Sequence, residues 1–415
     1  MNLLVLTTRL FDEPRSGGEL CTARLLKTLR DGGHRLTLVG RGDAALAQAW
    51  GDTAVSIGDV IGPFAQLKPH HQLAVLCAAH VHRQAITVHR QGGRQAAERH
   101  KALLQGPFDA CIVDHLQAWP WLGAKPVRPT MLVNHNIESD NYLEMAGSQG
   151  ASLGGPKPSA LMRRAILKRE ARCLLDIERQ ASRQAQVIAC LSAEDGRRMA
   201  SIAAGAGLDI ERKLCVLRGY PMGLHQTLRP APPQAPRRIG LMGTWTWEPN
   251  RTALRWFLHR VWPTLQDRCR LVLAGTGLEG LDWPAATQVL GRVDEVRSFY
   301  EAVDVVALPS LHGSGVQEKA IEAIGRGSIV VATRHALRGL GPALPPSVHQ
   351  ADTPQAFGAL CAGVPLQTPA REAHRRWAAD READYRQVLA WALERLHEPA
   401  AGTAPGFAPA QRWCA

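Results

Sequence analysis

One short segment in the second half of the chain combines glycines, a lysine and a glutamate in a pattern that suits phosphate binding. Gly313 and Gly315 follow a buried apolar run and precede a helical pattern that carries Lys319 and Glu322. Glycines let the backbone approach a ligand, and the N–H groups and dipole at a helix start attract an anion. Lys319 and Glu322 share one helix face, so the cation can bind a diphosphate and the carboxylate can accept hydrogen bonds from ribose hydroxyls. A glycine turn before a surface Lys–Glu pair would produce the same pattern.

Apolar runs that alternate with helical patterns must position these residues. In the first half the runs are residues 3–6, 36–39, 110–113, 131–133 and 186–191. In the second half they are residues 238–242, 271–274, 288–290, 303–308 and 328–332. Short runs with almost no polar interruption are typical of strands buried on both faces of a parallel sheet. The strand, glycine loop, helix and strand at the start of the chain open a Rossmann-like unit. We therefore predict an α/β fold with two Rossmann-like domains.

Proline marks the boundary between the two halves. Pro230, Pro232, Pro233 and Pro236 lie close together, which is a linker composition. The predicted parts are a first domain at 1–222, a Pro-rich linker at 223–237, a second domain at 238–365, a C-terminal helix at 366–398 and a loose tail at 399–415. Ligands of open α/β sheets bind at the carboxyl ends of the strands. Two domains facing across a cleft would therefore suit a reaction between two substrates.

The charge of the chain favours an anionic partner. Its 415 residues carry a net charge of +12, and basic residues concentrate in 66–101 and 163–183. Such stretches suit docking to an anionic membrane surface, although a solvated basic face is the more common explanation. No helix-turn-helix, zinc-finger or RNA-motif pattern supports a nucleic-acid binder, so we expect no nucleic-acid partner.

The number and spacing of the nine cysteines indicate in which redox environment the protein works. They are odd in number, scattered, and include no Cys-x-x-Cys pair, which favours buried, reduced thiols over disulfides or a zinc site. The first residues lack the pattern of a signal peptide, and no apolar stretch reaches transmembrane length. We expect a cytoplasmic protein that meets a membrane only peripherally, on its inner face.

Residues 308–340 resemble the donor-binding segment of glycosyltransferase family 4, whose members are retaining enzymes of GT-B fold. The similarity is to the branch written Gly-Ser-Gly-x-x-x-Lys-x-x-Glu-Ala, followed by a Val-Val-Ala-Thr strand at 330–333. The resemblance implies that the donor is bound by Gly313, Ser314, Gly315, Val316, Lys319 and Glu322. Ser314 stands where widely known members have a second Glu, which leaves open how the sugar ring is held.

Residues 243–257 resemble the first strand, loop and helix of the family's donor domain, in which Pro-Asn, Ala and Trp-Phe recur. This resemblance adds Gly243 and Asn250 to the donor-binding set and makes Arg251 a contact to the leaving diphosphate. Thr244 departs from the pattern, because an Arg is common at its position. The family's loops around the nucleotide base and diphosphate correspond here to Gly275 and Val293.

The first half carries a patchier resemblance. Gly17 and Gly18 look like the family's N-terminal glycine loop, which approaches donor phosphate and acceptor. His135 matches a His-Asn-x-Glu segment after a buried strand, where the family's His lies near the reacting sugar. The remaining residues assigned to the acceptor side are Asp114, His115 and Glu138.

The resemblance implies a GT-B protein with a C-terminal helix that packs back toward the N-terminal domain. It also implies sugar transfer from a nucleotide sugar to an acceptor hydroxyl with retained configuration, without metal or cofactor. We assign catalysis to His135, Arg251 and Lys319. The acceptor is a sugar, a lipid-linked molecule or a small molecule, in polysaccharide, glycolipid or other glycoconjugate biosynthesis. The alternative is an inactive or epimerase-type GT-B protein that binds a sugar nucleotide.

Overall fold

The computed structural model describes residues 1–62, 64–148, 158–222, 236–280, 282–285, 287–313, 315–366 and 371–397. The predicted tail at 399–415 lies outside this description, as does the predicted linker except for residues 236 and 237. The chain divides into two compact units. Unit 1 contains Met1–Leu217 and the chain from Arg386 onward, and unit 2 contains Arg218–Tyr385. No helix of the described chain has both the length and the apolar character that crossing a bilayer requires.

Unit 1 is built on a seven-stranded parallel sheet in the order β3-β2-β1-β4-β5-β6-β7. Its strands are β1 (Asn2–Thr7), β2 (Arg35–Gly40), β3 (Thr53–Ser56), β4 (Ala110–Asp114), β5 (Thr130–Asn134), β6 (Val187–Cys190) and β7 (Leu214–Val216). The five strands predicted in this half are all present. The two that were missed, β3 and β7, are the edges of the sheet and are only four and three residues long.

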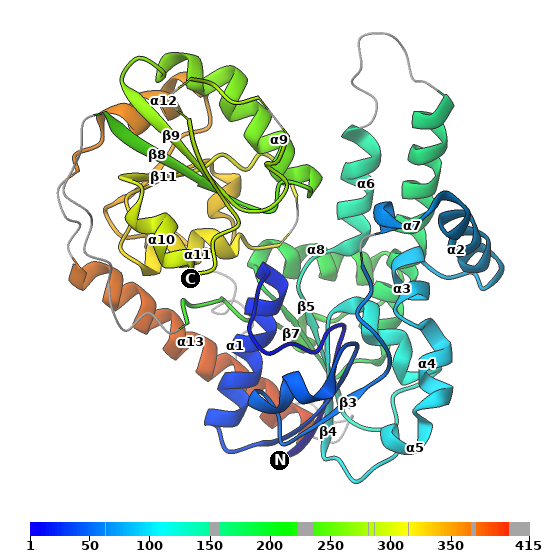
Figure 1. Cartoon of the computed structure of the whole chain (residues 1–415). Coiled ribbons are helices and arrows are strands. Elements are labelled where there is room, and N and C mark those ends of the chain that lie inside the picture. The colour runs from blue at the N-terminus through cyan, green and yellow to red at the C-terminus, as the bar shows by residue number, and fades with distance from the viewer. Residues whose placement is uncertain are drawn as a thin grey trace. The chain divides into compact units, whose positions relative to one another are not determined.

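Helices connect these strands and cover the sheet (Figure 1). They are α1 (Gly17–Asp31), α2 (Pro69–Val81), α3 (Ile86–Arg90), α4 (Gly93–Arg99), α5 (Lys101–Leu104), α6 (Glu138–Ser148), α7 (Pro158–Gln184) and α8 (Ala193–Ala204), with short turns η1 (Ala44–Ala49), η2 (Phe64–Gln66), η3 (Leu116–Leu122) and η4 (Glu211–Lys213). The Ser16 hydroxyl accepts a hydrogen bond from the Glu19 N–H and caps α1. The cap at Ser16 starts the helix at Gly17, so Gly17 and Gly18, predicted as a loop, lie instead in the first turn of α1.

Unit 2 repeats the design with a six-stranded parallel sheet in the order β10-β9-β8-β11-β12-β13. Its strands are β8 (Arg237–Met242), β9 (Cys269–Ala274), β10 (Thr287–Gly291), β11 (Val305–Leu308), β12 (Val330–Ala332) and β13 (Val348–Gln350). Its helices are α9 (Glu248–Trp256), the π-turn η5 (Phe257–Val261), η6 (Trp262–Thr264), α10 (Val296–Glu301), α11 (Glu318–Gly325), η7 (His335–Leu337), α12 (Pro354–Gly363) and α13 (Arg371–His397). The missed strand, β13, is again a short edge.

Alternate strand residues of unit 2 enter two different cores. Leu271 and Leu273 of β9 pack in the core under α9 and α12, whereas Val272 and Ala274 pack in the core under α10 and α11. Side chains of a strand alternate between faces, so the sheet is buried on both sides. This explains why its central strands read as uninterrupted apolar runs.

The long C-terminal helix α13 belongs to both units. Its first part packs in unit 2, where Trp377 joins the core. Its last part belongs to unit 1, where Arg386 donates to Asp31 on α1 at 3.0 Å. Of the described cysteines, Cys77 is exposed and Cys173 is partly buried, while the others are buried.

Candidate active site

Each sheet reverses its strand order at one point, and the predicted site residues follow that point in both units. The reversal lies between β1 and β4 in unit 1 and between β8 and β11 in unit 2. Loops at such a switch point leave a crevice at the carboxyl edge of the sheet, where ligands bind. The topology therefore predicts one binding edge per unit.

In unit 2, the loops after β8, β9 and β10 lie against one another. Gly275 has a φ of 116°, and a Cβ on it would lie 1.8 Å from the Gly243 carbonyl oxygen. Its N–H donates to the carbonyl of Gly291 at 2.7 Å. No residue but glycine fits at position 275 without moving the neighbouring backbone, so these loops form one continuous edge.

Lys319 reaches this edge from the first turn of α11. Its Nζ donates to Asn250 Oδ1 at 3.2 Å, and Asn250 Nδ2 donates to the Thr244 carbonyl at 3.0 Å. The bond joins residues 69 positions apart in the chain. The structure thus brings together Lys319, Asn250 and the Gly243 loop.

The Lys319 ammonium is electrostatically unsatisfied. The side chain is partly buried, and desolvation lowers the pKa of Lys319 to about 8. Within the described ranges, no carboxylate forms an ion pair with it. Burial disfavours a charge that has no partner, so a bound anion would supply the missing counter-charge.

Glu322 has a protein partner that the sequence reasoning missed. Its Oε1 accepts from Arg326 Nε at 3.1 Å and from Nη2 at 2.9 Å, and the Arg326 guanidinium lies over the Tyr300 ring. Burial raises the pKa of Glu322, although Arg326 opposes the shift. The spacing of four residues was a readable signal for this pair. A ribose would have to share Glu322 with Arg326.

The structure describes the remaining residues predicted in the donor site, with one exception. Gly313 and Gly315 have φ values of 113° and 81°, as expected of a glycine loop. Val316 and Val293 are partly buried against the core of unit 2. Arg251 is exposed on the first turn of α9. Ser314 lies outside the described residues.

In unit 1, a buried carboxylate organises the end of β4. Asp114 is fully buried, and its Oδ1 accepts from His135 Nε2 at 2.7 Å. Its Oδ2 accepts from the hydroxyls of Thr22 at 2.5 Å and Thr7 at 3.3 Å. Burial alone would raise the pKa of Asp114, but the two histidines and these hydrogen bonds outweigh it and lower the pKa to about 2. The two threonines were not predicted.

His115 completes the cluster under backbone strain. It has a φ of 83°, which side chains rarely adopt, and its ring stacks on that of His135 with centroids 3.7 Å apart. A Cβ on Gly18 would lie 3.4 Å from His115 Cε1, so Gly18, one residue after Gly17 at the start of α1, gives the ring room. Burial and His135 lower the pKa of His115 to about 3 although Asp114 opposes them. His115 is therefore neutral at pH 7.

Asp114, His115 and His135 are residue types that bind metal ions, but their geometry does not suit a metal site. Ligand atoms of Asp114, His115 and His135 all lie within 4.8 Å of one another. The two imidazole planes are stacked and differ by only 30°, so their in-plane lone pairs do not converge on one point. The carboxylate is already occupied by three hydrogen bonds. The arrangement fits a His–Asp pair better than a metal cage.

Glu138 lies at the start of α6. Its Oε1 accepts from Asn136 Nδ2 at 3.4 Å, and burial raises its pKa. The sequence placed Glu138 on the acceptor side. The structure puts it three residues after His135, at the carboxyl end of the adjacent strand β5.

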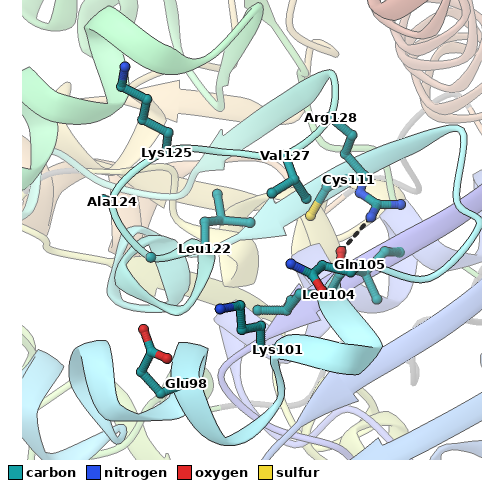
Figure 2. Close-up of a pocket in the computed structure, with 12 residues that line it drawn as sticks. Glu98, Lys101, Leu104, Gln105, Cys111, Leu122, Ala124, Lys125, Val127 and Arg128 are labelled. Atoms are coloured by element: carbon teal, nitrogen blue, oxygen red, sulfur yellow. Dashed lines mark hydrogen bonds between the residues drawn. The ribbon is translucent and has the colours of Figure 1, made fainter.

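A cavity of about 220 Å³ in unit 1 is separate from the predicted residues (Figure 2). It is lined by the α4–α5 region and the connection from η3 to β5, with Lys101, Lys125 and Glu98 at its edge. The Arg128 guanidinium donates to the carbonyls of Gly106, Phe108 and Leu104. These bonds give Arg128 a structural role, and the lining includes no predicted site residue.

Comparison with known proteins agrees with the fold. Residues 236–350 match the family model described as "Glycosyl transferases group 1". Similar solved structures include a glycosyltransferase from Rickettsia africae ESF-5 (14% identity, TM-score 0.57, covering 96% of this chain and 99% of that one). Another is Anabaena Alr3699/HepE in complex with UDP and glucose (15% identity, TM-score 0.57, covering 95% and 99%). A third is TarM (11% identity, TM-score 0.60, covering 96% and 99%).

No curated protein matches the chain. At identities this low, the structural likeness establishes the fold alone. The chain has the predicted α/β GT-B fold, with two parallel-sheet, Rossmann-like units.

Proposed function

We propose that the chain is a glycosyltransferase that moves a sugar from a nucleotide sugar to an acceptor hydroxyl. The observation that carries the proposal is Lys319, a partly buried cation without an ion-pair partner among the described residues, hydrogen-bonded to Asn250 at the glycine edge of unit 2. The match of residues 236–350 to a glycosyltransferase family model supports it. So does the UDP-bound relative of the same fold.

In this proposal unit 2 binds the donor. The glycosidic bond to the diphosphate breaks and negative charge develops on the leaving group. Lys319 and Arg251, together with N–H groups of the 313–315 loop, stabilise that charge, which is usually the largest catalytic contribution. Glu322 accepts hydrogen bonds from the ribose, and Gly275 and Val293 lie near the base.

Unit 1 serves the acceptor side in this proposal. His135 contacts the reacting sugar, and the buried Asp114 is a positioning residue that fixes the orientation of its imidazole. His115 and Gly18, in the first turn of α1, shape the pocket. Transfer proceeds with retained configuration: the acceptor oxygen attacks the face from which the diphosphate leaves, and the acceptor proton passes to a phosphate oxygen.

The finer features of the proposal come from the family 4 resemblance. They are the retaining outcome, independence of metal and cofactor, and a role in polysaccharide, glycolipid or other glycoconjugate biosynthesis. The His135 ring is stacked on His115 and hydrogen-bonded to Asp114, an arrangement that suits a His–Asp pair better than a metal site and is compatible with metal-independent transfer. We place the protein in the cytoplasm, in peripheral contact with the membrane.

A thermal-shift screen with UDP-, GDP- and ADP-linked sugars tests the proposal. A donor at about 100 times its Kd stabilises the protein by about 2.7 kcal/mol, so we expect one nucleotide class to raise the Tm by roughly 5–10 °C. Product analysis with that donor should then find a glycosylated acceptor and free nucleoside diphosphate. Absence of a shift with every nucleotide sugar would refute the proposal, whereas binding without transfer to any acceptor would favour the inactive or epimerase-type alternative.

The membrane contact in this proposal maps to helix α2. Residues 60–97 contain no Asp or Glu, and α2 exposes an apolar stripe of Leu73, Cys77 and Val81 at helical spacing. Leu73 is 62% exposed and Val81 is 75% exposed. Exposed apolar residues within a basic surface suit the headgroup region of an anionic bilayer.

Vesicle co-sedimentation should detect this contact. We expect about tenfold stronger binding to phosphatidylcholine vesicles that contain phosphatidylglycerol than to those that lack it. The double variant Leu73→Glu, Val81→Glu should lose this preference because it removes apolar burial and adds negative charge. Val127→Glu is the control, because Val127 is also 62% exposed in unit 1. Equal sedimentation with both vesicle types, or an equal loss in the control, would count against the surface.

A further inference from the structure

The segment after β12, from Thr333 to Arg338, is hydrogen-bonded to the loop after β11 that contains Gly313. Arg338 Nη1 donates to the Gly313 carbonyl at 3.2 Å, and the Thr333 hydroxyl donates to the Ser310 carbonyl. The Thr333 N–H also donates to the carbonyl of Leu308 at 3.2 Å. The two segments therefore behave as one bonded unit at the carboxyl edge of the sheet.

The bond from Arg338 to the Gly313 carbonyl restrains a position at which the backbone conformation favours glycine. Gly313 and Gly315 both occupy the left-handed half of φ space, and glycine loses the most conformational freedom when it is fixed. A Cβ on Gly313 would meet no atom within 4 Å, so the residue faces open space rather than packed side chains. The Arg338 bond is a charge-assisted restraint on this loop.

A second arginine holds the turn that carries Arg338. Arg381, on α13, is only 7% exposed. Its Nη1 donates to the Leu340 carbonyl at 3.0 Å, and its Nε donates to the Gly219 carbonyl at 2.7 Å. Its guanidinium lies 5.0 Å from the centre of the Trp377 ring. Leu340 is thus anchored two residues after Arg338.

We propose that Arg338 is a positioning residue for the donor loop. It holds the Gly313 carbonyl and so keeps the loop in the conformation that receives the diphosphate, while Arg381 holds the Arg338 turn against α13. The inference rests on the proposed function for its ligand. The effect on the loop itself does not depend on the ligand: without Arg338, the glycine loop is more dynamic before any ligand binds. Lys319 is the direct cation at this edge, and Arg338 acts through the backbone.

The test compares Arg338→Met with Arg334→Met. Arg334 is exposed on the same segment and lies beside Asp352 rather than the glycine loop. Without nucleotide, we expect amide hydrogen exchange at Gly315 and Val316 to accelerate about 10- to 100-fold in Arg338→Met, the loss expected for one charged hydrogen bond. The Kd for the nucleoside diphosphate and the donor KM should rise by a similar factor while kcat changes less. Arg338→Lys should recover part of the loss, because its ammonium can still donate to one carbonyl.

The outcomes separate this inference from the proposed function. If the unaltered protein binds no nucleoside diphosphate, the proposed function fails, while the exchange measurement still judges the loop restraint. Unchanged exchange at Gly315 and Val316 in Arg338→Met would overturn the inference. If the Kd rises without a change in exchange, Arg338 contacts the ligand directly and is not a positioning residue. Loss of thermal stability with unchanged Kd and KM would also overturn it.

Discussion

Replacement of Lys319 by alanine should lower the rate of sugar transfer by about two to three orders of magnitude, the usual cost of removing one preorganised charge-stabilising donor. The fold should survive, because the Lys319 ammonium makes one hydrogen bond, to Asn250, and its charge is partly desolvated. Steady-state transfer assays measure the effect, and circular dichroism confirms folding. Lys27→Ala is the matched control, since Lys27 pairs with Asp31 at an exposed site on α1.

The pH dependence gives the same prediction a second readout. Burial lowers the pKa of Lys319 to about 8, and only the protonated amine attracts a diphosphate. The Kd should therefore rise by only about twofold between pH 7 and 8 and more steeply above pH 8, by at most about tenfold per pH unit. Lys319→Arg should abolish this rise because arginine stays protonated. Equal activity of Lys319→Ala and Lys27→Ala would contradict the role of Lys319.

The Asp114→Asn substitution should have the largest effect on stability. Asp114 is fully buried and accepts hydrogen bonds from His135, Thr22 and Thr7. Removing the charge from such a pair costs about 3–5 kcal/mol in the free energy of unfolding. Unit 1 can be followed separately by hydrogen exchange at the amides of β4. Asp31→Asn is the control, and its exposed ion pairs should contribute less than about 1 kcal/mol.

Acid should remove part of this stabilisation. The folded-state pKa of Asp114 is lowered from 3.8 to about 2, so its contribution is fully present above about pH 4 and is lost as the pH falls towards 2. The shift corresponds to about 2 kcal/mol. In Asp114→Asn, the stability of β4 should not show this loss between pH 4 and 2. Similar losses in the Asp114 and Asp31 variants would contradict the role assigned to the buried carboxylate.

The central strands were predictable because burial on both faces leaves a visible signal. β1, β4, β8 and β11 read as short apolar runs, and the switch points between them predict one binding edge in each unit. The edge strands β3, β7 and β13 were missed because only one neighbour pairs with each of them and they are short. A three- or four-residue strand leaves little periodicity to detect.

Only those features of the site that involve residues close together in the sequence were predictable. The spacing of Lys319 and Glu322 on one helix face is a local property, and the structure keeps both on α11. The bond from Thr22 to Asp114 joins residues 92 positions apart, and the bond from Arg338 to Gly313 spans 25. No spacing rule connects such pairs, because they meet only when parallel strands bring their carboxyl ends to one edge.

Isothermal titration with a nucleoside diphosphate and the corresponding monophosphate tests the central claim most directly. In the proposed function, the glycine edge of unit 2 binds the diphosphate of a nucleotide sugar together with Lys319. We predict that the diphosphate of the preferred nucleoside binds at least about tenfold more tightly than the monophosphate, a difference of about 1.4 kcal/mol. This difference should disappear in Lys319→Ala and persist in Lys27→Ala. Equal binding of the two nucleotides by the unaltered protein, or binding of neither, would contradict the account.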